Sequence, residues 1–172
     1  SIEKNFPEGR EQFSICTKGR NILLSGGIST NKKEMNFWSL NIKSLEWKKI
    51  GLMNQTNGRF GHTTIYNDNK IFIYGGRIKE KNKSILVGLE ILSLKDYTFS
   101  KPYIQKEPPD RRNHIALCIC NHMLIHGGVD VNNEILSDCH FLNLETLKWV
   151  EPHIEQYTQK PKVYGHSYSL VI

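Results

Sequence analysis

The side chains best suited to chemistry form a cluster in the second half of the chain: His114, Cys118, Cys120, His122 and His126. Residues two apart on a β-strand share a face, so several of these side chains could line one side of a strand as metal ligands. Structural zinc sites usually present ligand pairs from a turn, and the sequence contains no second pair of this kind. We therefore predict no metal and no cofactor, and we expect these side chains to be buried or half-buried.

Three histidines, His62, His114 and His166, recur 52 residues apart. A catalytic histidine is expected once, so this recurrence predicts a structural role performed in each copy of a repeat. The sequence has no nucleophile elbow, phosphate-binding loop or zinc-protease motif, and its acidic residues form no pair placed for acid–base catalysis. We predict that the chain is not an enzyme, although a longer protein containing it could carry a catalytic domain elsewhere.

A longer pattern repeats around the histidines. Each copy has a short apolar run that closes on a glycine doublet, and a large aromatic residue follows about twenty residues later. The doublets are Gly26-Gly27, Gly75-Gly76 and Gly127-Gly128, and the aromatic residues are Trp47, Phe99 and Trp149. A period of about 50 residues indicates a solenoid, a propeller or another repeat array.

Each copy of the pattern predicts four short strands. The first strand follows the histidine, the second ends on the doublet, and the third and fourth form a hairpin that ends near the aromatic residue. No segment of about eleven residues or more has convincing helical periodicity. The sequence therefore predicts an all-β chain of antiparallel four-stranded sheets, which must pack on one another because a single sheet cannot bury its own faces.

This combination of doublet, aromatic residue and period resembles the kelch repeat, which builds β-propeller blades of four strands each. The likeness runs from about Gly9 to Ile172, with Phe99 in place of the usual tryptophan and Asn113 where other copies have Gly61 and Gly165. It implies one propeller domain over 1–172, with approximate repeats at 9–58, 59–110 and 111–161 and the start of a further blade at 162–172.

The resemblance also implies an incomplete ring, because propellers of the kelch family most often have six blades. Three blades make about half of such a ring. We expect the rest to come from further blades of the same chain or from a second copy. The three aromatic residues are expected to pack between blades, where a large apolar side chain contributes most.

Two sets of loops should share one face of such a propeller. One set joins the second and third strands of each blade, at 28–35, 77–86 and 129–135. The other joins successive blades, at 51–59, 102–112 and 151–162. Loops on a rigid scaffold commonly carry function, and the candidate partner-binding residues in these loops are Arg59, Arg77, Lys79, Arg111 and Arg112.

These basic side chains could pair with an acidic or phosphorylated segment of a partner protein. The alternative is that the arginines before the histidines anchor the blades and that the lysines keep the surface soluble. The net charge of +6 also suggests nucleic-acid binding as a hypothesis. However, no nucleic-acid motif occurs, and the aromatic residues recur with the core positions of the repeat rather than among the basic loops. We predict no nucleic-acid partner.

No apolar run is long enough to cross a membrane as a helix. The four cysteines (Cys16, Cys118, Cys120 and Cys139) lack disulfide-like spacing, which favours free thiols in a reducing compartment, and we predict a cytoplasmic protein. The predicted function is a protein-interaction module, a scaffold or substrate adaptor. The alternative is a regulatory or targeting propeller attached to a catalytic domain, such as a kelch-containing serine/threonine phosphatase.

Overall fold

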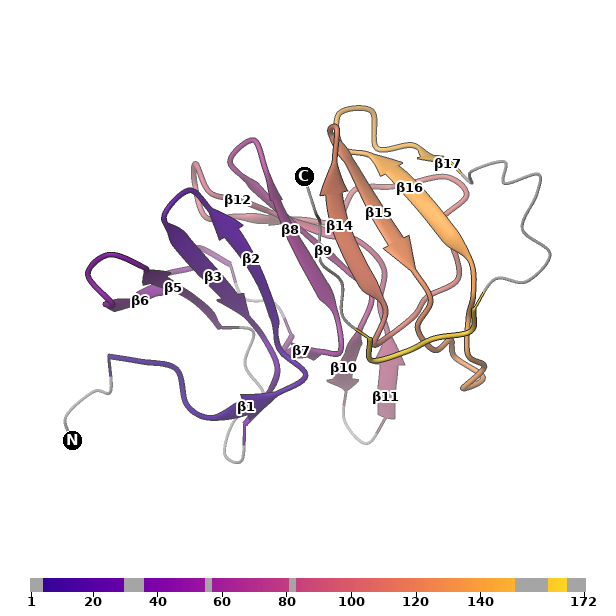
Figure 1. The fold of residues 1–172 in the computed structure, drawn as a ribbon, viewed down its shortest axis with the longest axis horizontal. Helices are drawn as coiled ribbons and strands as arrows, with labels where there is room; N and C mark the ends of the chain where they lie inside the picture. Colours follow the sequence, from indigo (N-terminus) through magenta and orange to yellow (C-terminus); the bar gives the residue numbers. More distant parts are fainter. Residues whose placement is uncertain (1–4, 30–35, 55–56, 81–82, 151–160, 167–172) are drawn as a thin grey trace.

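Three four-stranded antiparallel sheets make up most of the computed structural model, which describes residues 5–29, 36–54, 57–80, 83–150 and 161–166 (Figure 1). Blade 1 contains β2 (Ser14–Lys18), β3 (Asn21–Ser25), β5 (Phe37–Asn41) and β6 (Trp47–Ile50). Blade 2 contains β8 (Thr63–Asn67), β9 (Lys70–Tyr74), β12 (Glu90–Ser93) and β13 (Phe99–Ser100). Blade 3 contains β14 (Ile115–Ile119), β15 (His122–His126), β16 (Cys139–Asn143) and β17 (Trp149–Val150). The predicted all-β fold with four-stranded blades is confirmed.

The first strand of each blade lies next to the first strand of its neighbour. Strand β8 contacts both β2 and β14, and the three strands stand side by side in Figure 1. The remaining strands of each blade follow outward in chain order, so each blade is a meander that begins at the centre. Among the described residues no helix is present, and hence none that could span a membrane.

The core lies in the two seams between blades, and β9 shows why. Its residues alternate between the seams: Ile71 and Ile73 pack toward blade 1, whereas Phe72 and Tyr74 pack toward blade 3. All four side chains are buried. A strand covered on both faces must be apolar at successive positions rather than at every second one. The continuous apolar run before the second doublet therefore reflects a blade with a neighbour on each side.

Five short strands lie below the blades: β1 (Arg10–Glu11), β4 (Ile28–Ser29), β7 (Arg59–Phe60), β10 (Arg77–Glu80) and β11 (Lys83–Leu86). Strands β4, β10 and β11 lie in segments that the sequence predicts as loops, as does Arg59 of β7. Strand β1 pairs with β4, β7 pairs with β10, and isolated bridges join Arg112 to Val129 and Val129 to Ile135. The β1–β4, β7–β10 and Arg112–Val129 pairings each tie the segment that leads into a blade to that blade's loop between second and third strands, whereas the Val129–Ile135 bridge lies within one such loop. The two loop sets therefore share one side of the molecule, which we call the loop face (Figure 1).

Main-chain hydrogen bonds tie successive blades together where the connections reach the first strands. The Gly61 amide donates to the Gln12 carbonyl (2.9 Å), the Asn113 amide to the Gly61 carbonyl (2.8 Å), and the Gly165 amide to the Asn113 carbonyl (2.8 Å). We call these four residues the hub. Each has a positive φ, between 54° and 66°. Asn113 replaces glycine here because asparagine adopts the left-handed conformation more readily than most residues.

The glycine doublets allow the close approach of the repeated histidines. All six glycines have positive φ. A Cβ on Gly76 would lie 2.7 Å from the Cβ of His62, and a Cβ on Gly128 would lie 2.8 Å from that of His114. A side chain at these positions would collide with the residue that precedes the first strand of the same blade. The doublets are therefore required by sterics as well as by backbone conformation.

Candidate functional site

Two arginines from different blades meet on the loop face. Arg77 begins β10 directly after the second doublet, and Arg112 lies in the connection that leads into blade 3. Asn133, in the loop between the second and third strands of blade 3, lies between them. Its Oδ1 accepts hydrogen bonds from Nη2 of Arg77 (3.4 Å) and Nη2 of Arg112 (3.1 Å). One neutral oxygen is thus shared by two guanidinium groups, and we call these three residues the arginine clamp.

The positive charges of the clamp are not neutralised within the described part of the chain, where no Asp or Glu forms an ion pair with Arg77 or Arg112. The Nε atoms of both arginines are buried and have no hydrogen-bond partner there. Desolvation and then the charge of Arg77 lower the pKa of Arg112, while Tyr164 acts in the opposite direction. The clamp therefore holds two like charges close together in a partly dehydrated position.

The loop that carries Asn133 is held by its own hydrogen bonds. The Oδ1 of Asp130 accepts from the amides of Asn132 and Glu134, both at 2.8 Å. Asn133 itself has a φ of 64°, which asparagine tolerates. The Asp130 carboxylate is therefore engaged in the turn, and the loop that carries the shared oxygen is preformed.

Arg59 and Arg111, also predicted to bind a partner, are buried in the blades, with 1% and 0% of their surface exposed. Arg59 contacts Glu90 at 2.8 Å and donates to the carbonyl of Gly88 at 3.0 Å. Arg111 donates to both carboxylate oxygens of Asp138, at 2.6 and 2.7 Å. Neither guanidinium is accessible to a partner, and their geometry is that of the blade-anchoring alternative.

Arg111 and Asp138 form a bidentate ion pair. Burial alone would raise the pKa of Asp138, but hydrogen bonds from Arg111 and His140 outweigh it and hold that pKa well below the usual range. Arg111 also donates to the carbonyls of Gly127 and Pro109. The donors of Arg111 are therefore largely satisfied inside the protein, in contrast to those of the adjacent Arg112.

Arg10 is a third anchor that the sequence analysis missed. Its Nη1 donates to the carbonyl of Gly26 (2.9 Å), as Arg59 donates to Gly75 and Arg111 to Gly127. The signal was available, because each arginine precedes the first glycine of its doublet by 16 residues. The last predicted partner-binding residue, Lys79, has a side chain outside the described part of the structure.

Two of the three repeated histidines, His62 and His114, bridge the seams, whereas neither ring nitrogen of His166 has a hydrogen-bond partner in the described chain. His62 Nε2 lies 2.9 Å from Ser25 Oγ, and His114 Nε2 lies 2.8 Å from Thr63 Oγ1, so each histidine bonds to the preceding blade. Burial, followed by the charges of Arg111 and His166, lowers the pKa of His114 to about 3. Burial, followed by the charge of Arg59, also holds the pKa of His62 well below its usual value. Both rings are therefore neutral structural groups at physiological pH.

The remaining members of the His/Cys cluster are dispersed. Cys118 and Cys120 are exposed, His122 Nδ1 lies 2.8 Å from the carbonyl of Cys120, and His126 Nδ1 lies 3.0 Å from that of Asp138. In the portion of the chain that the structure describes, no three His, Cys, Asp or Glu side chains come together as a metal site would require.

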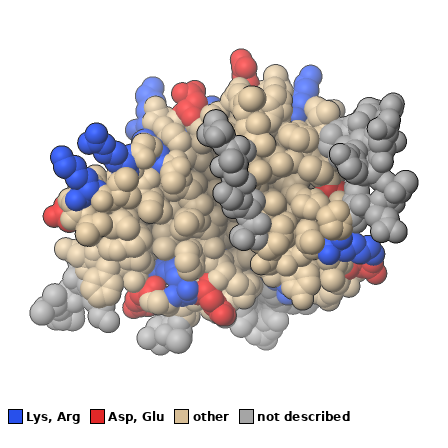
Figure 2. Space-filling model, in the orientation of Figure 1, with Lys and Arg blue, Asp and Glu red and all other residues tan. Residues whose placement is uncertain are grey.

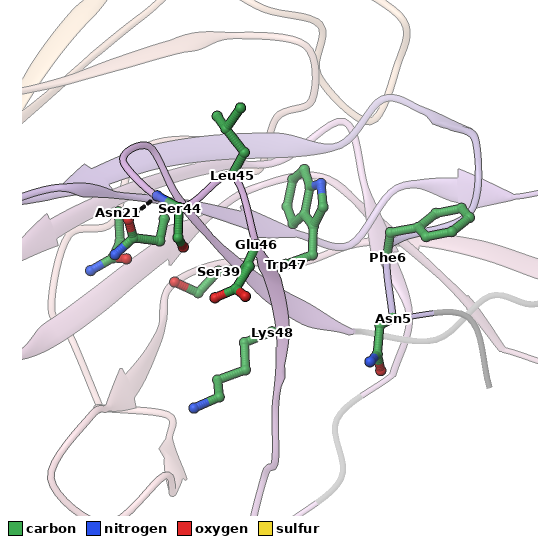
Figure 3. A pocket seen from close by; sticks show the side chains of 10 residues that line it. Asn5, Phe6, Asn21, Ser39, Ser44, Leu45, Glu46, Trp47 and Lys48 are labelled. Atoms are coloured by element: carbon green, nitrogen blue, oxygen red, sulfur yellow. Dashed lines mark hydrogen bonds between the residues drawn. The ribbon is translucent and has the colours of Figure 1, made fainter.

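The repeated aromatic residues have different surroundings. Trp149 packs against Tyr74 of blade 2, with ring centroids 5.1 Å apart, and Phe99 packs against Phe37 of blade 1 at 5.9 Å. Trp47 instead lines a groove of about 580 Å³ on the outer side of blade 1, together with Phe6 and Leu45 (Figure 3). Trp47 has no interblade partner because no described blade precedes blade 1.

The surface charge follows the loops. Figure 2 shows Lys, Arg, Asp and Glu mainly along the upper and lower edges of the molecule, where turns and connections lie, whereas the middle of this side is mostly uncharged. The clamp belongs to the lower edge in the orientation of Figure 1, at the loop face.

Three blades with these seams, doublets and interblade aromatic residues are the architecture of one repeat family. The model of the KLHDC2/KLHL20/DRC7 Kelch-repeats domain matches residues 1–172. The chain belongs to the kelch-repeat family. Kelch repeats generally form protein-interaction propellers and are generally not catalytic, although fold alone does not settle function.

Relatives of this kelch chain are considerably longer. Adagio-like protein 1 of Oryza sativa subsp. japonica is 27% identical over 168 residues, which cover 94% of this chain and 26% of the relative. Tip elongation aberrant protein 1 of Schizosaccharomyces pombe is 26% identical over 135 residues, which cover 74% of this chain and 12% of the relative. The chain therefore spans about a quarter or less of these proteins.

A solved structure, that of YjhT, gives a TM-score of 0.71 at 12% sequence identity and covers 88% of this chain and 53% of its own. At this identity the likeness shows the fold alone. This kelch chain corresponds in extent to about half of that structure.

Proposed function

We propose that this kelch chain is a protein-interaction module, a cytoplasmic scaffold or substrate adaptor, that binds its partner through the loop face. The observation that carries this proposal is the arginine clamp. Arg77 and Arg112 hold two charges together without a carboxylate partner in the described chain. Their conformation is favourable when a negative group from another molecule binds between them.

The partner segment is expected to be acidic or phosphorylated. The clamp straddles the seam between blades 2 and 3, because Arg77 belongs to one blade and Arg112 and Asn133 belong to the other. A segment lying across the seam would contact loops of both blades at once. Its affinity would then depend on the blades being correctly packed, which couples binding to the integrity of the propeller.

We also propose that further blades of the same protein complete the ring. The open side of blade 1 presents Trp47 at the repeat position where Trp149 contacts a neighbouring blade. A second copy could cover this groove instead, and light scattering on the complete protein separates the two arrangements. A monomer whose Trp47 is shielded from solvent quenchers supports further blades, whereas an obligate dimer contradicts them.

The test of partner binding is affinity capture from the native cell with the complete protein as bait. Arg77→Glu combined with Arg112→Glu should abolish capture of the selectively bound protein. The matched control is Arg20→Glu combined with Lys70→Glu, which makes the same charge change at two exposed positions on the opposite side. The proposal fails if no protein is captured selectively, or if the control pair removes the captured protein while the clamp pair does not.

A further inference from the structure

The clamp and the neighbouring anchor show two different states of an arginine in this protein. Arg111 is matched by the two oxygens of Asp138 and by two carbonyls, which satisfy its charge and most of its donors. Arg77 and Arg112 share a single neutral oxygen, that of Asn133. Among the described residues, the clamp therefore has an excess of two positive charges and N–H groups without a partner.

We propose that the arginine clamp binds a phosphomonoester, the phosphorylated side chain of the partner segment that the proposed function places on the loop face. A single carboxylate would neutralise only one of the two guanidinium groups. A phosphomonoester carries about −1.5 to −2 charges at pH 7 and three strongly accepting oxygens, so it can neutralise both. The inference rests on the proposed function and specifies its ligand.

The geometry of the clamp suits a bridging oxyanion. Both Nη2 atoms lie within hydrogen-bond distance of one point, now occupied by Asn133 Oδ1. A phosphate oxygen at that point would accept from both arginines. The other two oxygens would remain available to further Nη–H groups of the two guanidiniums.

Asn133 is suited to act as a neutral placeholder. Its side chain is exposed, and its loop is held by Asp130 through main-chain amides rather than by the clamp. The side chain can therefore rotate away from the arginines while the turn persists. The Gly165 amide donates to the carbonyl of Asn113, which follows Arg112, so the adjacent Tyr164, 56% exposed, offers an aromatic surface near the site for residues that flank the phosphorylated one.

The experiment uses methyl phosphate as the minimal phosphomonoester and acetate as the carboxylate, titrated into the complete protein at constant ionic strength. The arginine Nε–Hε resonances are followed by NMR and assigned with Arg77→Lys and Arg112→Lys. Methyl phosphate should shift the Arg77 and Arg112 resonances, with an affinity at least about tenfold above that of acetate, and leave the Arg111 resonance in place.

Two isosteric variants make the test specific. Asn133→Asp places a carboxylate between the arginines and should weaken methyl phosphate binding at least about tenfold. Asn132→Asp adds the same charge one residue away on the same loop and should weaken it far less. Asn133→Gly removes the side chain but keeps a residue that accepts positive φ. It should retain binding, which would show that the loss in Asn133→Asp comes from the added charge rather than from the missing amide.

Equal affinity for acetate and methyl phosphate would overturn the inference in favour of a carboxylate ligand. The absence of any shift at Arg77 and Arg112 would overturn it as well. Neither result removes the proposed function, because capture by the loop face is measured separately with the charge-reversal pair. If capture persists and methyl phosphate does not bind, the loop face binds its partner through other chemistry.

Discussion

Blade 3 and blade 1 place the same repeat in two environments. In blade 3, Trp149 and Leu147 pack onto the core shared with blade 2. In blade 1, Trp47 and Leu45 line an open groove, and Leu45 is 73% exposed. The strands and turns are otherwise alike. The repeat therefore specifies the shape of a blade, whereas the neighbouring blade decides which of its residues contribute to stability.

The anchoring arginines also differ between the two blades, and again the one in blade 3 is the more deeply buried. Arg111 of blade 3 is fully buried and bound to a carboxylate, whereas Arg10 of blade 1 is half-buried and donates, within the described chain, to the carbonyls of Glu8 and Gly26. Phe13 of blade 1 occupies the position of His114 in blade 3. A Cβ on Gly27, the second glycine of its doublet, would meet Phe13, just as a Cβ on Gly128 would meet His114. Variants at matched positions can test how far the neighbour controls the outcome.

The largest difference is expected at the anchors. Arg111→Ala removes one partner of a buried ion pair and should lower the free energy of unfolding by about 3–5 kcal/mol. Arg10→Ala removes hydrogen bonds from a half-buried side chain and should cost about 1 kcal/mol. Urea unfolding of both variants measures the contrast. Similar losses for the two variants would show that the carboxylate partner adds nothing to the anchor.

The second-largest difference in stability is expected between the two tryptophans at matched positions, Trp149 and Trp47. Trp149→Ala should cost about 3 kcal/mol, because it opens a cavity beside the core that blades 2 and 3 share. Trp47→Ala in the isolated 172-residue chain should cost about 1 kcal/mol, since its ring has no opposing blade. Thermal unfolding gives both values. In a protein whose ring is closed, the Trp47 variant should lose as much as the Trp149 variant, so the same pair also reports ring closure.

Acidification should act through the seam histidines. The pKa of His114 is about 3 in the folded chain and near 6.5 when unfolded, so the unfolded state binds more protons below pH 6.5. Stability should therefore fall as the pH is lowered from 6.5, by roughly 2 kcal/mol per histidine at pH 5. Denaturant titrations of wild type and His114→Phe measure this dependence. If the free energy of unfolding of the variant depended on pH as steeply as that of wild type, His114 would not be a source of the acid sensitivity. Phenylalanine is chosen because Phe13 occupies the equivalent position in blade 1.

The smallest effect concerns the hairpin turns between the third and fourth strands. Leu45 and Leu147 have positive φ, at 57° and 54°. Leu45→Gly should stabilise the isolated chain by about 0.5 kcal/mol, because glycine relieves the left-handed strain and little packing is lost. Leu147→Gly should destabilise it by about 1–2 kcal/mol, because the side chain packs on the core. Stabilisation by both variants would show that Leu147 contributes no packing energy.

Periodicity alone predicts most of the fold. The doublets, histidines and aromatic residues recur because each blade repeats one local structure, and four strands per copy follow from the alternation of apolar runs and turns. The short strands of the loop face were not predicted. Most of them pair separate segments, such as Arg77 with Phe60, and such pairings leave no local pattern in the sequence.

The site was only partly predictable. Arg77 and Arg112 were selected as basic loop residues, but nothing in the sequence brings them to the same asparagine across a seam. Arg111 and Arg112 are adjacent and chemically identical, yet one points inward to Asp138 and the other toward the clamp. That choice depends on which direction each side chain takes and on a carboxylate 27 residues away, which spacing does not reveal.

The hub has a consequence for how such a protein can change over generations. Its links between blades use only main-chain amides and carbonyls, and its four positions already carry Gln, Gly, Asn and Gly. Substitutions that accept a positive φ therefore leave the connection between blades intact. The side chains around the loop face are free to be replaced as partners change, while the backbone keeps the blades in register beneath them.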